Sequence, residues 1–438
     1  MFDITIFAML GFLFASYAVV GNDALQTLGT FINSNSRLHW FWLFLFAALI
    51  LVFTFTYGWY INGGDPSWGR LANVKKYPEV NIEWYHTLPP LVLVIITRYG
   101  IPVSTSFMVL TVFATMGGMT SMLKKSLIGY GLAFAVGLLL YLILSKTLER
   151  YFKENDVSEK APYGLATVMA LIIGLIVYFV PPLINPELNY TSATIGKIIA
   201  VGVVVDITSY FMVQRFGKGM YWTILQWVTT GYLWGVWLIQ DFANIFVFLP
   251  RQLTWVEGFA GLVVIVILLG YTFWNKGGPV QKILSSKTAV TDIRSATVID
   301  FTYASLLFFF KEVSNIPMST TFVFLGLIAG REYGFTLLDK AMSFNKASKH
   351  FVSDASKAYL GLMISINMAV GLPRLSQYLS DKPVDPIPQE YLVFIAVANF
   401  LIIPVAWYFQ KRKKKRRMYF AGATLIAAAL AFFVYMPG

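Results

Sequence analysis

The sequence predicts an all-α polytopic membrane protein built from two inverted-topology repeats, with about ten full spans and two re-entrant helical hairpins that contain broken helices. Three observations support this class. The 438 residues are 57% hydrophobic and only 13% charged, whereas soluble domains carry about 25% charged residues. Apolar segments of about 20 residues, the length that crosses a bilayer, recur along the chain. Three short motifs occur twice in the same order.

Ten segments are long and apolar enough to predict complete spans. They are residues 4–22, 40–61, 126–146, 163–181, 195–213, 222–248, 255–274, 357–374, 391–410 and 418–436. Two further apolar regions, 84–118 and 297–330, are interrupted near their middles, each at a polar stretch that ends in proline. Each half is short for a span, so each region predicts a hairpin that enters and leaves on one side. Non-helical backbone at that depth must face protein or a wet cavity.

The distribution of positive charge predicts the orientation. The net charge is +12, and the densest basic run, 411–417, lies between two apolar segments. We interpret it as a cytoplasmic loop rather than a nucleic-acid-binding surface. An even number of crossings then places both termini outside, with the basic segments 146–160, 215–218, 276–294 and 331–357 inside. We expect the cytoplasmic (inner) membrane of a prokaryote. The chain has no cysteine, which excludes disulfides and thiolate catalysis.

An internal repeat is visible in the motifs. Asp23 lies 218 residues before Asp241, and Ser104 lies 215 residues before Ser319, each within a similar motif. Five predicted crossings precede the second copy, and an odd number turns it upside down. The predicted units are therefore a first transmembrane repeat at 1–182, a connecting helix and loop at 183–215, and a second, inverted repeat at 216–438. Inverted repeats with interrupted helices at mid-membrane are typical of secondary transporters.

Each Pro-x-Ser-Thr-[Ser/Thr] motif, at 102–106 and 317–321, predicts a helix start. The free backbone N–H groups and the positive dipole end of a helix start bind anions without a charged side chain. Two such starts, brought together by the repeat, would hold a tetrahedral oxyanion from both sides. The alternative is that these hydroxyls only cap and pack helices, as Ser and Thr do in membranes.

The carboxylates in apolar segments indicate an ion path. A charged side chain inside a bilayer costs at least about 2.5 kcal/mol on insertion scales. Residues i and i+3 share a helix face, so Asp241 and Asn244 can approach one ion, and oxygen ligands suit a hard cation such as Na⁺. The competing interpretation is that Asp23 and Asp241 pair with basic side chains. The candidate basic partners are Arg98, Arg251 and Lys311, and the other carboxylates under the same suspicion are Asp206, Asp300, Glu257 and Glu312.

These duplicated motifs resemble those of the inorganic phosphate transporter (PiT) family. The resemblance implies inverted halves and transport of phosphate with Na⁺ or H⁺, or of sulfate in some relatives. It implies that the cation ligands are Asn22, Asp23, Gln26, Asp241 and Asn244. It implies that the anion is held by Ser104, Thr105, Ser106, Ser319, Thr320 and Thr321.

The chain departs from the family pattern at four positions and is identified as a divergent member. Gln240 precedes Asp241 where the family has Asn, and Gln26 stands where Asn is usual. Phe107 and Phe322 stand where a His commonly follows the Ser-Thr run. These changes bear on the substrate and the coupling ion more than on the fold.

We therefore expect a secondary active transporter of phosphate, with sulfate as the other candidate anion, and not an enzyme. Na⁺ is the expected coupling ion, and no cofactor or nucleic-acid partner is expected. H⁺ coupling and a homodimer stay open, and lipids surround the chain. Two other classes remain: an intramembrane enzyme that uses Asp23 and Asp241 as an acid–base pair, and a passive anion channel. The three histidines lack metal-ligand spacing, and no nucleotide-binding motif occurs.

Overall fold

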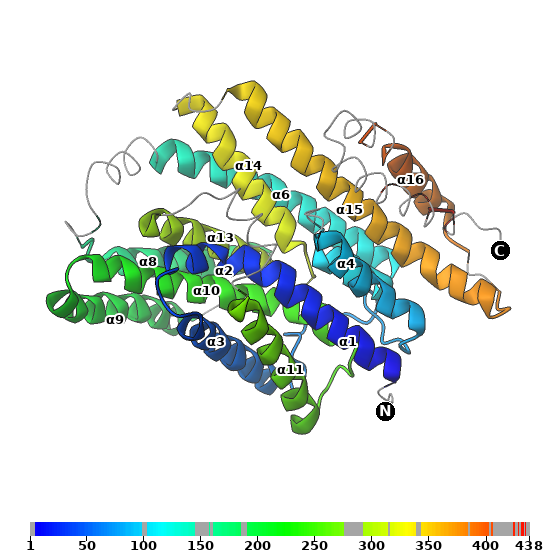
Figure 1. Ribbon diagram of the computed structural model, residues 1–438, viewed down its shortest axis with the longest axis horizontal. Helices are drawn as coiled ribbons and strands as arrows, with labels where there is room; N and C mark the ends of the chain where they lie inside the picture. The colour runs from blue at the N-terminus through cyan, green and yellow to red at the C-terminus, as the bar shows by residue number, and fades with distance from the viewer. Residues whose placement is uncertain are drawn as a thin grey trace.

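The computed structural model describes residues 5–98, 103–144, 157, 161–184, 191–275, 292–313, 316–338, 343–383, 386–402 and a few single positions beyond 403. Every regular element in these residues is a helix, and they contain no strand (Figure 1). The predicted all-α class is therefore confirmed. The basic run 411–417 and the predicted span 418–436 lie almost entirely outside the described residues.

The described helices before residue 217 are α1 (Ile6–Ala18), the π-helical turn η1 (Val19–Asp23), α2 (Ala24–Ser34), α3 (Trp40–Ile61), the 3₁₀ turn η2 (Trp84–Thr87), α4 (Leu88–Arg98), α5 (Thr105–Leu110), the 3₁₀ turn η3 (Thr111–Phe113), α6 (Met116–Leu144), α8 (Leu165–Ile184) and α9 (Ser192–Phe216). Those after it are α10 (Gly219–Phe246), α11 (Trp255–Trp274), α13 (Ile293–Val313), α14 (Thr320–Leu338), α15 (Phe344–Leu379) and α16 (Gln389–Phe400). The two predicted interruptions separate α4 from α5 and α13 from α14.

Two predicted boundaries are wrong. α6 begins at Met116, so Lys124 and Lys125 lie within a helix that was predicted to start only at residue 126. α15 spans 36 residues where a span at 357–374 was predicted, and with α14 it makes most of the basic segment 331–357 helical. Hydropathy marks only the apolar part of a helix, whereas Lys, Ala and Met continue the helix beyond it.

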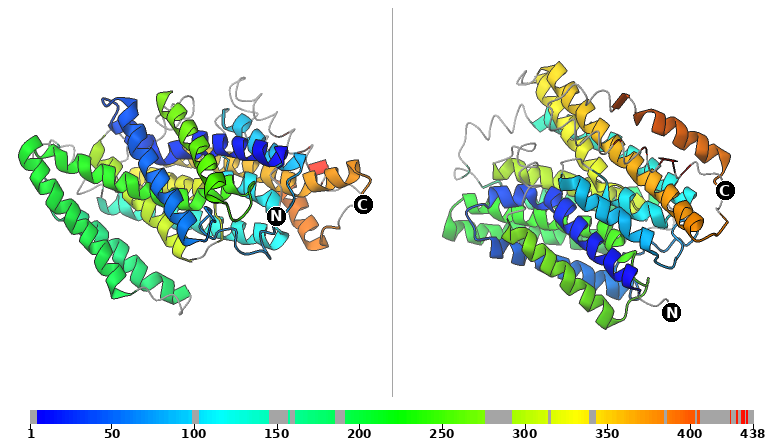
Figure 2. Two further views of the ribbon diagram at one scale, coloured as in Figure 1. Left: turned by 90° about the horizontal axis from the view of Figure 1, so that it is seen from below. Right: turned by 45° about the vertical axis from the view of Figure 1, so that its right-hand side comes forward.

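α10 is the central helix, with both motif residues Asp241 and Asn244 on its buried face. It packs against α13, α9, α3 and α2. The other contacts come in matched pairs. α1 packs on α4 as α10 packs on α13, and α5 packs on α15 as α14 packs on α6. Figure 2 shows the α6–α14–α15 layer on one side of the molecule and the α8–α9 pair at an edge.

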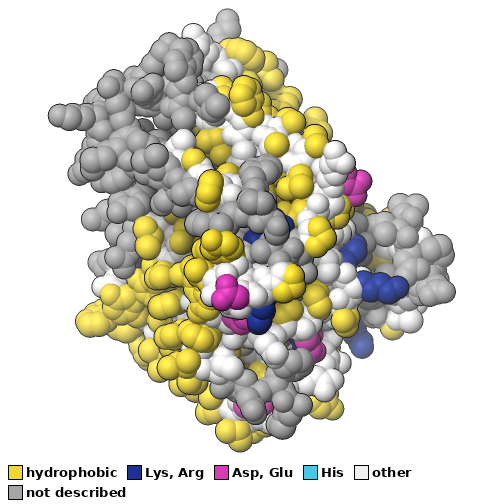
Figure 3. Space-filling model, turned by 90° about the vertical axis from the view of Figure 1, so that its right-hand side faces the viewer, with side chains coloured by type: hydrophobic (Ala, Val, Ile, Leu, Met, Phe, Trp, Pro, Cys, Tyr) yellow, Lys and Arg dark blue, Asp and Glu magenta, His cyan; other side chains and the backbone are white. Residues whose placement is uncertain are grey.

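Seven of the described helices are long and apolar enough to cross a membrane, namely α3, α6, α8, α9, α11, α13 and α15. Their outward faces are apolar: on α9, Val201, Val204 and Phe211 are all more than half exposed. Hydrophobic side chains cover much of the described surface in Figure 3. Lipid is the solvent that such a surface requires, so the chain is an integral membrane protein.

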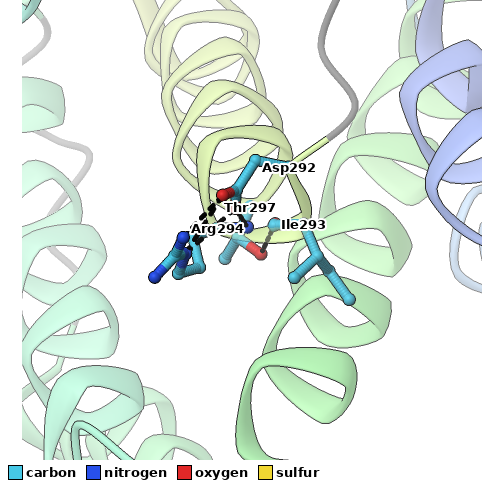
Figure 4. A network of polar contacts seen from close by, with 4 residues as sticks. All are labelled: Asp292, Ile293, Arg294 and Thr297. Atoms are coloured by element: carbon cyan, nitrogen blue, oxygen red, sulfur yellow. Dashed lines mark hydrogen bonds and ion pairs between the residues drawn. The ribbon is translucent and has the colours of Figure 1, made fainter. Parts of the chain in front are cut away.

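The start of α13 is fixed by a local ion pair (Figure 4). Asp292 accepts the backbone N–H of Arg294 at 2.8 Å, and the Arg294 guanidinium Nη2 lies 2.7 Å from Asp292 Oδ2. Burial acts to raise the pKa of the Asp292 carboxyl, but the hydrogen bonds and charge of Arg294 outweigh it, so this pKa lies below its usual value. The carboxylate therefore stays ionised at the helix N-terminus, where it is favourable.

Candidate functional site

The two Ser-Thr motifs form matching N-caps. Ser104 Oγ accepts the backbone N–H of Phe107 at 3.2 Å, and Ser319 Oγ accepts that of Phe322 at 3.1 Å. A serine cap of this kind satisfies one of the free N–H groups at a helix start. Each capping hydroxyl keeps its own proton for donation to a further acceptor. All six predicted anion ligands are buried: Ser104, Thr105, Ser106, Ser319, Thr320 and Thr321 are each at most 4% exposed.

The two helix starts lie next to each other although 215 residues separate Ser104 from Ser319. The rings of Phe107 and Phe322 are in contact, with centroids 5.8 Å apart and planes at 41°. These are the two positions at which the sequence departs from the family histidine. The ring contact therefore places apolar surface beside the two starts, where two imidazoles would have been polar.

Asp241 and Asn244 of α10 bridge the two motifs. Asn244 Nδ2 donates to Ser106 Oγ at 3.3 Å, and it also donates to Asp241 Oδ1 one turn away. Thr320 Oγ1 donates to Asp241 Oδ2 at 3.4 Å. Asp241 is 1% exposed and Asn244 is fully buried. The structure thus brings the predicted cation ligands of the second repeat into contact with the predicted anion ligands of both repeats.

Three oxygen atoms at this site have no hydrogen-bond partner among the described residues. They are Thr105 Oγ1, Thr321 Oγ1 and Asn244 Oδ1. Buried polar atoms are normally hydrogen-bonded, and an unmade bond costs about 1–3 kcal/mol. Three such atoms around one bridge point to ligands, or to side chains outside the description, as their partners.

The first-repeat cation ligands are only partly described. Asn22 and Asp23 end the π-helical turn η1, and Gln26 lies in the first turn of α2, but their side chains are outside the described residues. π-helical turns inside α-helices occur frequently at functional sites. The turn packs against α1, α2, α11 and α10, so it borders the same central helix that carries Asp241.

Sequence reasoning missed two buried cations beside the second motif. Lys125 Nζ donates to the carbonyl oxygen of Ile316 at 2.8 Å, and Arg70 Nη1 donates to the same oxygen at 3.4 Å. Arg70 Nε also donates to Ile239 O at 3.1 Å, two residues before Asp241 on α10. Lys125 is 8% exposed and Arg70 is 2% exposed. In the sequence, Lys125 stands directly before the span predicted to start at residue 126, and nothing in the pattern around it or around Arg70 predicts their burial beside Ile316.

The backbone before Ser319 is also held by a neighbouring hydroxyl. Ser126 Oγ, on the turn of α6 next to Lys125, accepts the backbone N–H of Ser319 at 2.8 Å. Ser126 is fully buried. α6 therefore positions the second helix start through the Lys125 donor to Ile316 O and the Ser126 hydroxyl acceptor for Ser319 N–H.

Two of the four other suspected carboxylates, Asp206 and Glu257, have structural roles. Asp206 Oδ1 and Oδ2 accept four hydrogen bonds, from Gly164 N–H, Thr167 N–H, Thr167 Oγ1 and Tyr221 OH. Glu257 forms a capping box with Thr254 at the start of α11. The Glu312 side chain lies outside the described residues. Asp300 differs from these, because both of its partners in the described chain are threonine hydroxyl groups.

The basic side chains proposed as competitors for the aspartates are partly accounted for. Arg251 Nη2 donates to the carbonyl oxygens of Tyr77 and Pro78, each at 3.5 Å, rather than to Asp241. The Arg98 side chain lies outside the described residues. The described residues contain no group of three or more His, Cys, Asp or Glu that would hold a metal through such ligands. A cation here would rely on amide, hydroxyl and backbone oxygens beside single carboxylates.

The comparisons with known proteins bear on the fold. No protein-family model matches the sequence, and a search of curated proteins gives no match. Among solved structures, the chain is similar to one described as "The sodium-dependent phosphate transporter", with a TM-score of 0.54 and 16% sequence identity. The match covers 83% of this chain and 95% of that chain. At this identity the likeness establishes a shared fold, which agrees with the membrane architecture predicted from the sequence.

Proposed function

We propose that this chain is a secondary active transporter that carries phosphate across the membrane together with Na⁺. The observation that carries the proposal is the bridge of Asp241 and Asn244 between two buried Ser-Thr helix starts. The similar solved structure is described as a sodium-dependent phosphate transporter, which supports this substrate and this ion.

The anion is proposed to lie between the two helix starts. Their backbone N–H groups and hydroxyl protons converge from two directions, which suits the several oxygen acceptors of a tetrahedral ion. Ser106 Oγ, which accepts from Asn244, keeps its own proton as a further donor, and Thr321 Oγ1, which lacks a partner among the described residues, supplies one from the other motif. Arg70 and Lys125 both donate to the carbonyl oxygen of Ile316. They would add positive electrostatic potential next to the second helix start.

The matched helix contacts support an inverted repeat and extend the site to the first half. Counting by the motif spacing, Thr105 corresponds to Thr320, and Thr321 corresponds to Ser106. Asp241 and Asn244 engage Thr320 and Ser106, so the counterparts Asp23 and Gln26 are expected to engage Thr105 and Thr321. Those two threonine hydroxyls are the ones without a described partner. A second cation site made by Asn22, Asp23 and Gln26 follows from this correspondence.

Electrostatics explains why such a site would couple the ions. An ionised Asp241 beside a phosphate repels it, and in a buried site this repulsion is weakly screened. A Na⁺ held by Asp241 and Asn244 reverses the sign of the local interaction. The anion therefore binds well only after the cation, and the Na⁺ gradient drives its transport.

Uptake into liposomes by the purified protein tests this function. An imposed inward Na⁺ gradient should drive accumulation of radiolabelled phosphate, with K⁺ replacing Na⁺ as the matched control. If only a proton gradient drives accumulation, the coupling ion is H⁺ and not Na⁺. If sulfate accumulates and phosphate does not, the transported anion is sulfate. Equilibration without any cation dependence would indicate a channel, and chemical turnover without a gradient would indicate an enzyme.

A further inference from the structure

Asp300 is a buried carboxylate that the proposed ion sites do not use. It lies in α13 and is 1% exposed. Thr30 Oγ1 of α2 donates to its Oδ1 at 2.8 Å, and Thr230 Oγ1 of α10 donates to its Oδ2 at 2.8 Å. Three helices that are far apart in the sequence thus meet at one carboxyl group. A buried, hydrogen-bonded carboxyl group in an apolar membrane segment indicates a function.

The groups around Asp300 do not balance a negative charge. α13 packs against α2, α8, α10 and α14. The titratable or charged side chains that these elements and α13 carry among the described residues are Tyr178, Tyr221, Tyr232, Asp241, Arg331, Glu332, Tyr333, Arg294, Tyr303 and Lys311. None of them hydrogen-bonds or forms an ion pair with Asp300, whose partners in the described chain are the two threonines. An isolated ionised carboxylate would be costly in this place.

Asp206 shows the contrast with a carboxylate built to stay ionised. It accepts two backbone N–H groups, Gly164 at 3.1 Å and Thr167 at 2.9 Å, as well as two hydroxyls. A backbone N–H can only donate, so it requires the acceptor form of the carboxyl group. The partners of Asp300 are both hydroxyls, which donate to a carboxylate but can also accept from a carboxylic acid after rotation. The Asp300 site therefore accommodates a proton without losing a hydrogen bond.

A line of polar groups leads away from Asp300. One turn beyond Thr30 and Thr230, Ser34 Oγ accepts a hydrogen bond from Gln226 Nε2, and Asn35 Nδ2 donates to Gln226 Oε1 at 2.9 Å. Ser36, which follows Asn35, is exposed. We call these residues, Thr30, Ser34, Asn35, Gln226, Thr230 and Asp300, the polar seam. Ser34 Oγ donates to the backbone carbonyl oxygen of Thr30 at 2.8 Å, so polar groups extend from the buried carboxyl group toward the exposed end of α2.

The repeat has no second copy of this seam. By the motif spacings, Thr30, Thr230 and Asp300 correspond to Phe248, Phe12 and Tyr85. In that half Tyr85, His86, Phe113 and Phe248 form a continuous aromatic cluster, with successive ring centroids 4.1, 4.9 and 5.1 Å apart. Ordinary packing would thus suffice at the equivalent place. The seam is an addition to one half, independent of the duplicated Asp motifs.

From this geometry we propose that Asp300 is a proton-binding site, with Thr30 and Thr230 as its hydrogen-bonding partners. Binding adds one proton to Asp300 Oδ1 or Oδ2 and neutralises the group, and the adjacent threonine turns from donor to acceptor. Na⁺ is disfavoured because the described side chains offer one carboxyl and two hydroxyl groups, fewer oxygens than a hard cation usually takes. The role of this proton in a transport cycle rests on the proposed function, but its binding does not.

Infrared spectroscopy of the purified full-length protein tests the proposal without transport. The wild type should show the carbonyl band of a protonated carboxylic acid, sensitive to deuterium oxide and lost as the pH rises. The band should be missing in Asp300→Asn and present in Asp206→Asn. No such band in the wild type at any pH, or an unchanged band in Asp300→Asn, would overturn the proposal. A band that appears only after Na⁺ is removed would also overturn it, since it would assign the site to Na⁺.

Threonine variants keep the test informative even if Asp300→Asn fails to fold. Thr30→Val and Thr230→Val remove one hydroxyl each with nearly the same side-chain shape. Each should shift the frequency of the acid band and the pH at which it disappears, and Thr54→Val, on α3, should do neither. An unchanged band and midpoint in both seam variants would contradict the assignment. These readouts are unaffected by whether phosphate is carried, so failure of the anion proposal would leave them intact.

Discussion

The two Ser-Thr helix starts share a capping geometry but differ in their support. At both, the serine hydroxyl accepts an N–H from the phenylalanine three residues later, at 3.2 and 3.1 Å. Beyond that, Ser104 begins a helix of six residues, whereas Ser319 precedes one of 19 residues. Lys125, Arg70 and Ser126 gather at the second start in the described chain. The comparison teaches that the two starts share their serine caps, and that basic side chains of the described chain gather at the second start.

The largest effect is expected from Asp241→Asn, because Asp241 contacts the second start directly and would hold the cation for both. Sodium-driven phosphate uptake should be abolished, since the variant loses the ligand charge and keeps the side-chain shape. Asp23→Asn should also abolish sodium-driven phosphate uptake if Asp23 binds a cation in the first half as Asp241 does in the second. Uptake in liposomes is the measurement, and Glu257→Gln, which neutralises a capping carboxylate on α11, is the matched control. If phosphate uptake by both aspartate variants depended on Na⁺ as strongly as uptake by the wild type, Asp23 and Asp241 would not be cation ligands.

Lys125→Met sharpens the comparison by removing charge from the second start alone. Lys125 donates to the Ile316 carbonyl rather than to the anion, so its charge would act on phosphate through space, and phosphate affinity should fall by about tenfold to a hundredfold. Lys125→Arg should restore most of it, because the charge and donor return. Lys124→Met is the matched control, since its side chain is the exposed neighbour on α6. Equal phosphate affinities of Lys124→Met and Lys125→Met would show that the buried cation does not act on the anion.

The smallest effect is expected from Ser104→Ala and Ser319→Ala. Each removes one hydroxyl from a dry site, so phosphate should bind about tenfold more weakly to each variant, while Na⁺ binding is largely kept. Ser209→Ala, which removes a buried hydroxyl from the peripheral helix α9, should leave phosphate affinity unchanged. Calorimetric titration with phosphate and sulfate gives the affinities. If both serine variants bound phosphate and sulfate with the affinity of the wild type, these serines would serve only as helix caps.

The sequence predicted the positions of the helix breaks and the motifs because these depend on local chemistry. The proline and serine motifs mark the breaks between α4 and α5 and between α13 and α14. The apolar segments 40–61 and 255–274 coincide with the observed bounds of α3 and α11. Tertiary contacts were beyond such reasoning. Arg70 lies in a loop and Lys125 in a helix, and only the fold brings both to the Ile316 carbonyl. Asp300 was suspected as a buried carboxylate, but its threonine partners come from helices 270 and 70 residues away.

The central claim is that the two helix starts and the Asp241–Asn244 bridge form one anion site that depends on Na⁺. Calorimetric titration of the wild-type protein with phosphate, in Na⁺ and then in K⁺, tests it most directly. One phosphate per chain should bind in Na⁺, and binding in K⁺ should be lost or greatly weakened, because the unneutralised Asp241 repels the anion. Two independent phosphate sites per chain, or equal affinity in Na⁺ and K⁺, would contradict the account.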